Sequence, residues 1–265
     1  MTDSAHYVKD NPGASGRWEA AGLRWLGEAT AAGGAQVVGV VGATPHRLTI
    51  DRVHTVAPTA EMAERFGAEL AATHSYGAPA FGFNPAGEGE PGFQGPNDDL
   101  RALPLQEYES WGEFYADVCL QPLVEDVLPR LGGSDQQAAE QLLDRLRAGE
   151  FDEGAAPARI HGDLWSGNLM WGRLASAPDR EPAGILIDPA AHGGHPQADL
   201  AALQLFGAPH LETILGAYAE AAHLDSGWRE RTQLHQQHLL WMHAAIFGGG
   251  YVDQTLAAVR RALAL

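Results

Sequence analysis

The sequence predicts an α+β fold in two lobes: a small N-terminal lobe with a short antiparallel sheet and one helix, and a larger, mostly helical C-terminal lobe. Three observations lead to this prediction. Residues 5–53 read as strand, helix, strand, strand, and roughly the last eighty residues follow a mainly helical pattern. The chain has 265 residues, 45% of them hydrophobic, which is enough to bury a sizeable core.

The N-terminal elements follow from periodicity and turn residues. The stretch AHYVKD (5–10) predicts a strand that contains Lys9, the only lysine in the chain. SGRWEAAGLRWLGEATAAGG (15–34) predicts a helix that Ser15 caps and two glycines end. QVVGVVG (36–42) and RLTIDRV (47–53) predict two strands, and PTAEMAERFGAELAATH (58–74) predicts a second helix. We place the lobe boundary between residues 54 and 55.

The C-terminal lobe begins with helix 58–74 and then turns irregular. Residues 77–99 are dense in Gly, Pro and Asn, which predicts either a loop on the substrate side or a simple connector. Helical runs are expected over about 106–130 and 134–149. The segment ARIHGDLWSGNLMWG (158–172) and the apolar strand GILIDP (184–189) follow, before the final helical region.

The charge of the chain restricts its partners. The formal net charge is −17 and the sequence pI is about 5.0. Nucleic acids and anionic membrane surfaces need clustered positive charge, so we expect neither as a partner. A small-molecule partner is favoured.

The sequence has neither a cationic N-terminal region followed by an apolar run nor a stretch of apolar residues long enough for a membrane span, so we expect a cytoplasmic protein. The single cysteine, Cys119, lies in a helical context without basic neighbours, so we expect a buried hydrophobic residue rather than a nucleophile. His235, His238 and His243 lie on one expected helix. Because no acidic or cysteine partner lies at ligand spacing, we expect packing there rather than a metal site.

Three polar residues indicate phosphoryl transfer. Asp163 and Asn168 lie five positions apart in an expected loop, and Asp188 follows at the end of an apolar strand. A hairpin between them would bring all three side chains to one edge. Phosphoryl transfer from ATP needs a carboxylate for the proton of the attacking hydroxyl, and oxygen ligands that hold Mg²⁺ against the phosphates.

Three longer motifs carry a resemblance to a known family. HGDLWSGN (161–168), DPAAHGGHPQADLAALQLFG (188–207) and HAAIFGGGY (243–251) resemble the fructosamine kinase (ketosamine kinase) family. This family is a branch of the aminoglycoside phosphotransferase and choline kinase group and has a protein-kinase-like fold. The resemblance extends from about Tyr7 to Tyr251 and implies a two-lobed kinase whose N-lobe is truncated before the lysine strand.

The resemblance also implies roles for individual residues. It makes Asp163 the catalytic base and makes Asn168 and Asp188 the Mg²⁺ ligands. His161 and Asp199 become structural residues that hold the catalytic loop.

On the nucleotide side, the resemblance makes Lys9 the phosphate-binding lysine and Glu19 its helix partner. A compact ammonium fits between phosphate oxygens and a glutamate as a point charge, whereas a planar guanidinium needs more room. The stretch LTIDRV resembles the hinge between lobes, where the backbone of Asp51 and Val53 would bind adenine.

The acceptor side is less specified. Trp165 is expected to be either a core aromatic or a wall of the substrate pocket, and His192 and His195 are expected near the hydroxyls of a sugar. The family often has aromatic residues and a glutamate where this chain has His192, Gly193 and Gln197. This departure leaves the acceptor open.

The region before Lys9 also departs from the family pattern. Kinase-like enzymes place a Gly-containing hairpin over the ATP phosphates before the lysine strand, but only eight residues precede Lys9, none of them glycine. We therefore expect this polypeptide to lack the hairpin and its N–H donors to phosphate. Either the natural protein is longer than this chain, or the short form is a weak or inactive nucleotide binder.

The expected function is that of an ATP- and Mg²⁺-dependent kinase that phosphorylates a sugar hydroxyl of a ketosamine, free or protein-bound, and so serves deglycation. Two alternatives stay open: an aminoglycoside- or choline-type phosphotransferase, and a catalytically silent kinase-like binding protein.

Overall fold

The computed structural model describes residues 5–265, which form eleven strands and ten α-helices. The strands are β1 (His6–Asp10), β2 (Gln36–Val37), β3 (Val40–Thr44), β4 (Arg47–Asp51), β5 (Val53–Thr55), β6 (Gly92–Gln94), β7 (Arg101–Leu103), β8 (Ala158–Ile160), β9 (Leu169–Leu174), β10 (Ala183–Leu186) and β11 (His192–Gly194). The helices are α1 (Ser15–Glu28), α2 (Ala60–Ser75), α3 (Trp111–Phe114), α4 (Gln121–Val127), α5 (Gly133–Arg147), α6 (Gln197–Phe206), α7 (Leu211–Ala221), α8 (Thr232–His235), α9 (Gln237–Phe247) and α10 (Gly250–Ala262).

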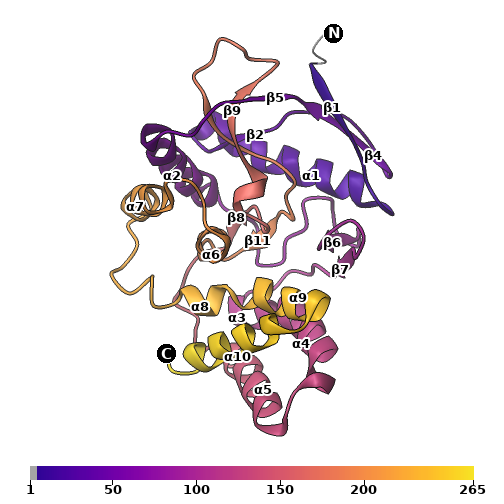
Figure 1. Cartoon of the computed structure of the whole chain (residues 1–265), viewed down its shortest axis with the longest axis vertical. Helices are drawn as coiled ribbons and strands as arrows, with labels where there is room; N and C mark the ends of the chain where they lie inside the picture. Colours follow the sequence, from indigo (N-terminus) through magenta and orange to yellow (C-terminus); the bar gives the residue numbers. More distant parts are fainter. Residues whose placement is uncertain (1–4) are drawn as a thin grey trace.

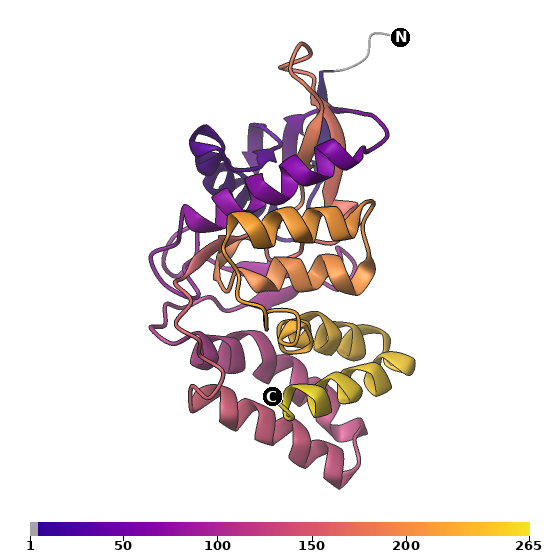
Figure 2. The same cartoon turned by 90° about the vertical axis from the view of Figure 1, so that its left-hand side faces the viewer.

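The elements are arranged along an elongated molecule. Helix α1 and the longer strands lie at one end, and α3, α4, α5, α9 and α10 lie at the other end with the C-terminus (Figure 1). Turning the molecule shows α2, α7 and α6 stacked in the middle, between the strands and the helical end (Figure 2). The expected α+β architecture, with a small strand-containing part and a larger helical part, is therefore present.

Two sheets share the N-terminal strands. β1, β4 and β3 form an antiparallel sheet in that order, and β2, β10, β9 and β5 form a second sheet. Each of the two expected strands is split between these sheets: QVVGVVG supplies β2 and β3, and RLTIDRV supplies β4 and β5. Hydrophobic pattern marks strands but carries no information on which partner each half will pair with.

Strand β5 crosses the lobe boundary that we placed after residue 54. Val53 pairs with Leu174 and Thr55 pairs with Gly172, so β5 is bonded to the hairpin β9–β10 that follows the HGDLWSGN segment. We expected no phosphate-covering hairpin in the residues before Lys9. Of these residues, 1–4 lie outside the part of the chain that the structure describes, and 6–8 belong to β1.

Helix α1 begins at the residue that the sequence indicates, but Ser15 does not cap it as expected. The hydroxyl of Ser15 donates to the carbonyl of Pro12 at 2.8 Å instead of accepting from the first helical turn. Trp18, Leu23 and Leu26 are buried on the face of α1 that meets the sheets and the segment around β6. Gly33 ends the following 3₁₀ turn in the left-handed region, at φ 94°.

The C-terminal lobe contains more structure than the sequence predicts. Segment 77–99 is not wholly irregular, because β6 pairs with β7. The helical run expected from residue 106 begins at Trp111, where the Ser110 hydroxyl accepts from the N–H of Glu113, and continues through a π-helix at Tyr115–Leu120. Cys119 lies in this π-helix and is buried, as expected, and burial raises the pKa of its thiol.

In the part of the chain that the structure describes, no helix has both the length and the apolar character needed to cross a membrane.

The helices in the middle of the molecule pack closely. Phe66 and Leu70 of α2 belong to one buried cluster with Ile214 and Tyr218 of α7. Gly67 of α2 permits this approach, because a Cβ atom at this position would lie 2.3 Å from the carbonyl oxygen of Ile214. The backbones of α2 and α7 can therefore cross only if residue 67 has no side chain.

We predict opposite effects for two glycine-to-alanine substitutions in this helix pair. Gly67→Ala should lower the free energy of unfolding by about 1–3 kcal/mol, because the added methyl forces the helices apart. Gly216→Ala on α7 has open space around the added Cβ and should leave stability unchanged or raise it by up to about 1 kcal/mol. Chemical denaturation of both variants checks this, and equal stabilities would contradict the proposed close crossing.

Candidate active site

A cavity of about 510 Å³ lies where the strand-containing part meets the helical part. Lys9 lines it from β1, and Glu19 lines it from α1. Asp163, in the HGDLWSGN loop, and Asp188, just after β10, line it from the other lobe. The segment around β6 and the helix α9 form the remaining wall. The structure thus brings residues from both lobes to one space.

The loop that carries Asp163 is held by its backbone. The buried carboxylate of Asp199 accepts hydrogen bonds from the N–H of His161 at 2.7 Å and of Gly162 at 3.0 Å. Gly162 has φ 79°, and a Cβ there would lie 2.3 Å from the carbonyl oxygen of Ala190, so only glycine fits. These contacts support the structural role that the resemblance implied for Asp199.

The ring of His161 fixes the same loop from inside. Its Nε2–H donates to the carbonyl oxygen of Ile187 at 2.8 Å, and its Nδ1 accepts from the N–H of Asp163 at 3.2 Å. Burial lowers the pKa of His161, which keeps the ring neutral and able to make both contacts. His161 therefore joins the Asp163 loop to the strand that leads to Asp188.

The predicted hairpin brings Asp163, Asn168 and Asp188 together. Leu169 pairs with Leu186 at the start of β9, so Asn168 and Asp188 leave the sheet at the same edge. The Nδ2 of Asn168 donates to Oδ2 of Asp163 at 3.0 Å and lies 3.4 Å from the carbonyl oxygen of Asp188. Because Nδ2 is used in this way, the amide oxygen of Asn168 is the atom available to a cation.

Asp188 has an unusual backbone conformation. Its φ of 51° lies in the left-handed region, which costs a residue with a side chain about 1 kcal/mol or more. Residues in such conformations cluster at functional sites, where the surrounding structure holds them in place. The strain fits a carboxylate that must point into the cavity rather than along the strand.

The carboxylate of Asp163 has a raised pKa. Burial raises the pKa of Asp163 to about 7; the hydrogen bond from Asn168 opposes this, and the nearby charges of Asp199 and Asp188 add to it. A general base acts most effectively when its pKa lies near the working pH. Among the described residues only Asn168 donates a hydrogen bond to the carboxylate of Asp163, and it does so to Oδ2. Oδ1 of Asp163 therefore remains available.

Lys9 joins the two lobes through its ammonium group. Its Nζ lies 3.0 Å from Oε2 of Glu19 and 3.0 Å from Oδ1 of Asp188. Burial alone lowers the pKa of Lys9, but the two carboxylates outweigh this and raise it above its ordinary value. Asn11 completes the arrangement by donating from Nδ2 to Glu19 at 2.7 Å. The ten-residue spacing from Lys9 to Glu19 thus corresponds to direct contact.

Asp51 and Val53, expected at the adenine position, do not line the cavity. The N–H of Asp51 donates to the carbonyl of Gly39 at 2.8 Å, so this N–H is not available to a ligand. On either side of Val53, the carbonyl of Arg52 accepts from Ala175 and the N–H of Val56 donates to Trp171. Because backbone groups alternate in direction along an antiparallel pair, the N–H of Val53 points away from β9. The adenine contact therefore stays a prediction.

Trp165 lies on the cavity wall and its side chain is 43% exposed, so it is not a core aromatic. Its ring lies over Gly167, where a Cβ would come within 2.2 Å of the indole. Phe206, His243 and Phe247 line the same cavity from α6 and α9. An aromatic surface therefore borders the space in front of Asp163.

The structure places His192 and His195 elsewhere. Each is 3% exposed, and both line a separate buried space of about 30 Å³ behind the catalytic loop. Nδ1 of His192 bonds the carbonyl oxygen of Ala190 at 2.8 Å. The cause is the strand β11, which pairs with β8 and buries His192 and the residues around it, so we no longer assign these two residues to the acceptor.

Sequence reasoning missed other residues of the site. His74 of α2 is buried and bonds Asp199 through Nε2 at 3.1 Å and Tyr218 through Nδ1 at 2.7 Å. The three histidines assigned to one helix are divided: His235 ends α8, whereas His238 and His243 lie on α9 and line the cavity. Because these contacts join residues more than a hundred positions apart, no local pattern in the sequence could have indicated them.

Comparison with known proteins agrees with this geometry. The family model for fructosamine kinase matches residues 13–265. A protein from Enterococcus faecium provisionally named ketoamine kinase is 28% identical over 197 residues, which is 71% of this chain and 64% of the relative. The mouse ketosamine-3-kinase is 31% identical over 159 residues, which is 57% of this chain and 47% of that protein.

Solved structures share the fold. The crystal structure of a protein from Thermobifida fusca provisionally named fructosamine-3-kinase superimposes with a TM-score of 0.84 at 37% identity, covering 100% of this chain and 88% of that one. A choline kinase from Streptococcus pneumoniae has a TM-score of 0.58 at 17% identity, covering 100% and 88%, and so shows the fold alone.

The matching segment spans 64% of the Enterococcus faecium relative and 61% of the next one, from Synechocystis, so this chain covers less than two thirds of each. Nearly the whole of this chain is nevertheless matched by the family model, and its catalytic loop, hairpin and lysine–glutamate pair lie together in one cavity. The chain belongs to the fructosamine kinase family.

Proposed function

We propose that the protein is an ATP- and Mg²⁺-dependent kinase that phosphorylates a hydroxyl group of a ketosamine, a sugar joined to an amine. One observation carries this proposal: Asp163, with its pKa near 7 and an available carboxylate oxygen, faces a cavity that also holds Asn168, Asp188 and Lys9. In this arrangement Asp163 can accept the proton of an attacking hydroxyl while the other three hold the phosphates.

The donor set fits Mg²⁺. The amide oxygen of Asn168 and the carboxylate of Asp188 are hard oxygen ligands on one edge of the hairpin, and Mg²⁺ prefers one or two such ligands together with phosphate oxygens and water. When bound, Mg²⁺ would neutralise charge that develops on the phosphates. Lys9 already contacts Asp188, so the lysine is positioned to reach a phosphate at the same place.

The acceptor assignment rests on the family and on the aromatic wall. Related proteins carry the names ketoamine kinase, ketosamine-3-kinase and protein-ribulosamine 3-kinase. Trp165 and His243 line the same cavity as Asp163 and offer flat faces on which a sugar ring can lie. A hydroxyl of that sugar would then lie within reach of the base.

We predict that the protein phosphorylates fructosyl-lysine or ribulosyl-lysine and that Asp163→Asn lowers kcat by about 10²–10⁴, because the base is lost. Coupled ADP release measures this, with Asp179→Asn, an exposed carboxylate, as the control.

A panel with choline and an aminoglycoside tests the other acceptors. Turnover by Asp163→Asn near the wild-type rate would refute the role of Asp163, and no turnover of any acceptor would favour a binding protein.

The pKa of Asp163 predicts two pH effects. Because the base must be ionised, kcat/KM should rise about tenfold per pH unit below pH 7 and level off above it. Folding also carries a cost that grows from about pH 3.9 and is complete above about pH 7, since Asp163 ionises near 3.9 when unfolded but near 7 when folded. Asp163→Asn should therefore raise the free energy of unfolding at pH 8 by roughly 2 kcal/mol, and by less at pH 4.

A pH–rate profile from 5.5 to 9 and denaturation at both pH values check these effects. A profile that is flat down to pH 5.5, together with an Asp163→Asn variant of unchanged stability at pH 8, would show that Asp163 has an ordinary pKa.

Lys9→Arg tests why the single lysine is placed here. The guanidinium is planar and larger than the ammonium, so we expect it to replace the single point charge that Nζ holds 3.0 Å from Glu19 and Asp188 by a differently placed group. We expect kcat/KM for ATP to fall at least about tenfold, and Lys9→Met to be no better. Arg47→Lys, on the exposed end of β4, serves as the matched control. Full activity of Lys9→Arg would mean that only the positive charge matters.

A further inference from the structure

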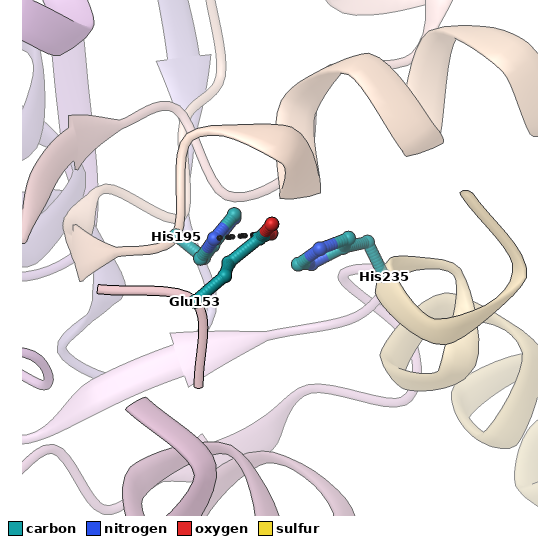
Figure 3. Close-up of side chains that lie close together, drawn as sticks. All are labelled: Glu153, His195 and His235. Atoms are coloured by element: carbon teal, nitrogen blue, oxygen red, sulfur yellow. Dashed lines mark ion pairs between the residues drawn. The ribbon is translucent and has the colours of Figure 1, made fainter. Parts of the chain in front are cut away.

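A second polar cluster lies behind the catalytic loop, outside the large cavity. Glu153 precedes β8, His195 follows β11, and His235 ends α8; their side chains point toward one another (Figure 3). One ligand atom from each residue lies within 4.8 Å of the other two. Three segments that are far apart in the sequence therefore bring two imidazoles and a carboxylate to one point.

The two imidazoles are buried without adequate partners. His195 and His235 are each 3% exposed. Among the described residues, both ring nitrogens of His235 lack a hydrogen-bond partner, and Nε2 of His195 lies 3.5 Å from Oε1 of Glu153 without hydrogen-bond geometry. A buried polar group left unpaired costs about 1–3 kcal/mol, so this cluster is built for a partner that the protein itself does not supply.

The two imidazole rings stack on each other, with ring centroids 4.2 Å apart and an angle of 26° between the ring planes. Trp111 covers both rings on one side, with ring centroids 5.0 Å from His195 and 4.9 Å from His235. Metal ligands must be neutral imidazoles, and two stacked rings can share one ion only if one of them turns its nitrogen toward it.

The local charge also suits a cation. Arg231 lies 2.8 Å from Oε2 of Glu153 and is shared with Asp225, so these three groups sum to one negative charge. Oε1 of Glu153 is left facing His195. Arg231 thus orients the carboxylate as a neighbouring hydrogen-bond donor does in metal sites.

We propose that Glu153, His195 and His235 bind one divalent transition-metal ion of the Zn²⁺ class, at a site separate from the proposed Mg²⁺ site. Two nitrogen donors and one oxygen donor suit Zn²⁺, Co²⁺ or Ni²⁺, whereas Mg²⁺ prefers oxygen alone. Ligand atoms of a tetrahedral zinc site lie about 3.3 Å apart. The separation of 3.5 Å between His195 and Glu153 matches this, whereas His235, whose ligand atom lies within 4.8 Å of the others, must move inward.

One contact sets a limit on affinity. Nδ1 of His195 accepts from the N–H of Gln197 at 3.2 Å, which places the ring proton on Nε2. A metal ion on Nε2 moves that proton to Nδ1 and opens the contact with Gln197. Binding is therefore weaker than at a closed structural zinc site. The buried space of about 30 Å³ beside both histidines can hold a water molecule as a fourth ligand.

The position of the cluster gives the ion a structural consequence. Strand β8 leads from the Glu153 segment to Asp163, β11 pairs with β8, and α8 belongs to the helical end of the molecule. An ion that bridges the three would fix the helical end against the strand that positions the proposed base.

The test uses the full chain with Asp188→Asn, which removes a carboxylate of the proposed Mg²⁺ site, after treatment with a chelator. Stoichiometric Co²⁺ should produce visible d–d absorption of a nitrogen-coordinated ion. Zn²⁺ at about 100 times its Kd should raise Tm by roughly 5 °C, whereas Mg²⁺ should not. Because neither readout uses activity, the result is independent of the proposed kinase function.

Two ligand variants and one control, each in that Asp188→Asn background, make the test specific. His235→Gln and Glu153→Gln should each weaken Co²⁺ binding at least about tenfold, and His46→Gln, an exposed histidine in another part of the chain, should not. Glu153 is partly exposed, so its variant stays informative if His235→Gln fails to fold. Absence of the Co²⁺ absorption before substitution, or equal absorption in both ligand variants, would overturn the proposal.

Discussion

The buried carboxylate of Asp199 is the interaction on which the site depends. It accepts hydrogen bonds from the backbone N–H groups of His161 and Gly162 and from Nε2 of His74. One carboxylate therefore holds the loop and also joins it to α2. Although burial raises the pKa of Asp199, these donors outweigh it and hold the pKa below its usual value. The permanent charge of Asp199 in turn raises the pKa of Asp163, so the group that positions the loop also adjusts its chemistry.

Lys9 extends this organisation to the other lobe. Through Glu19 it is tied to α1, and through Asp188 it is tied to the hairpin that also carries Asn168. The contact joins two carboxylates that would otherwise repel each other in a partly buried space. In a chain with a net charge of −17, the single lysine is therefore placed where it relieves repulsion in the cavity itself.

The elements that sequence predicted well are those fixed by local chemistry. The hairpin between Asn168 and Asp188 follows from an apolar strand on each side of a short connector, and its register brings both residues to one edge. Where distant segments compete, prediction failed. Ser15 bonds Pro12 instead of capping α1, and the β-like runs divide between two sheets because each half has a different partner. His192 and His195 are buried because β11 pairs with β8.

The sequence by itself determined the fold class, the family and the residues of the proposed catalytic segment, because each is carried by a contiguous motif or a local period. Only the tertiary structure decided what each of these histidines contacts. His243 reaches the cavity, His74 reaches Asp199, and His235 meets His195 and Glu153 behind the loop. The physical reason is that burial and partner choice for a polar side chain depend on segments that fold against it from elsewhere in the chain.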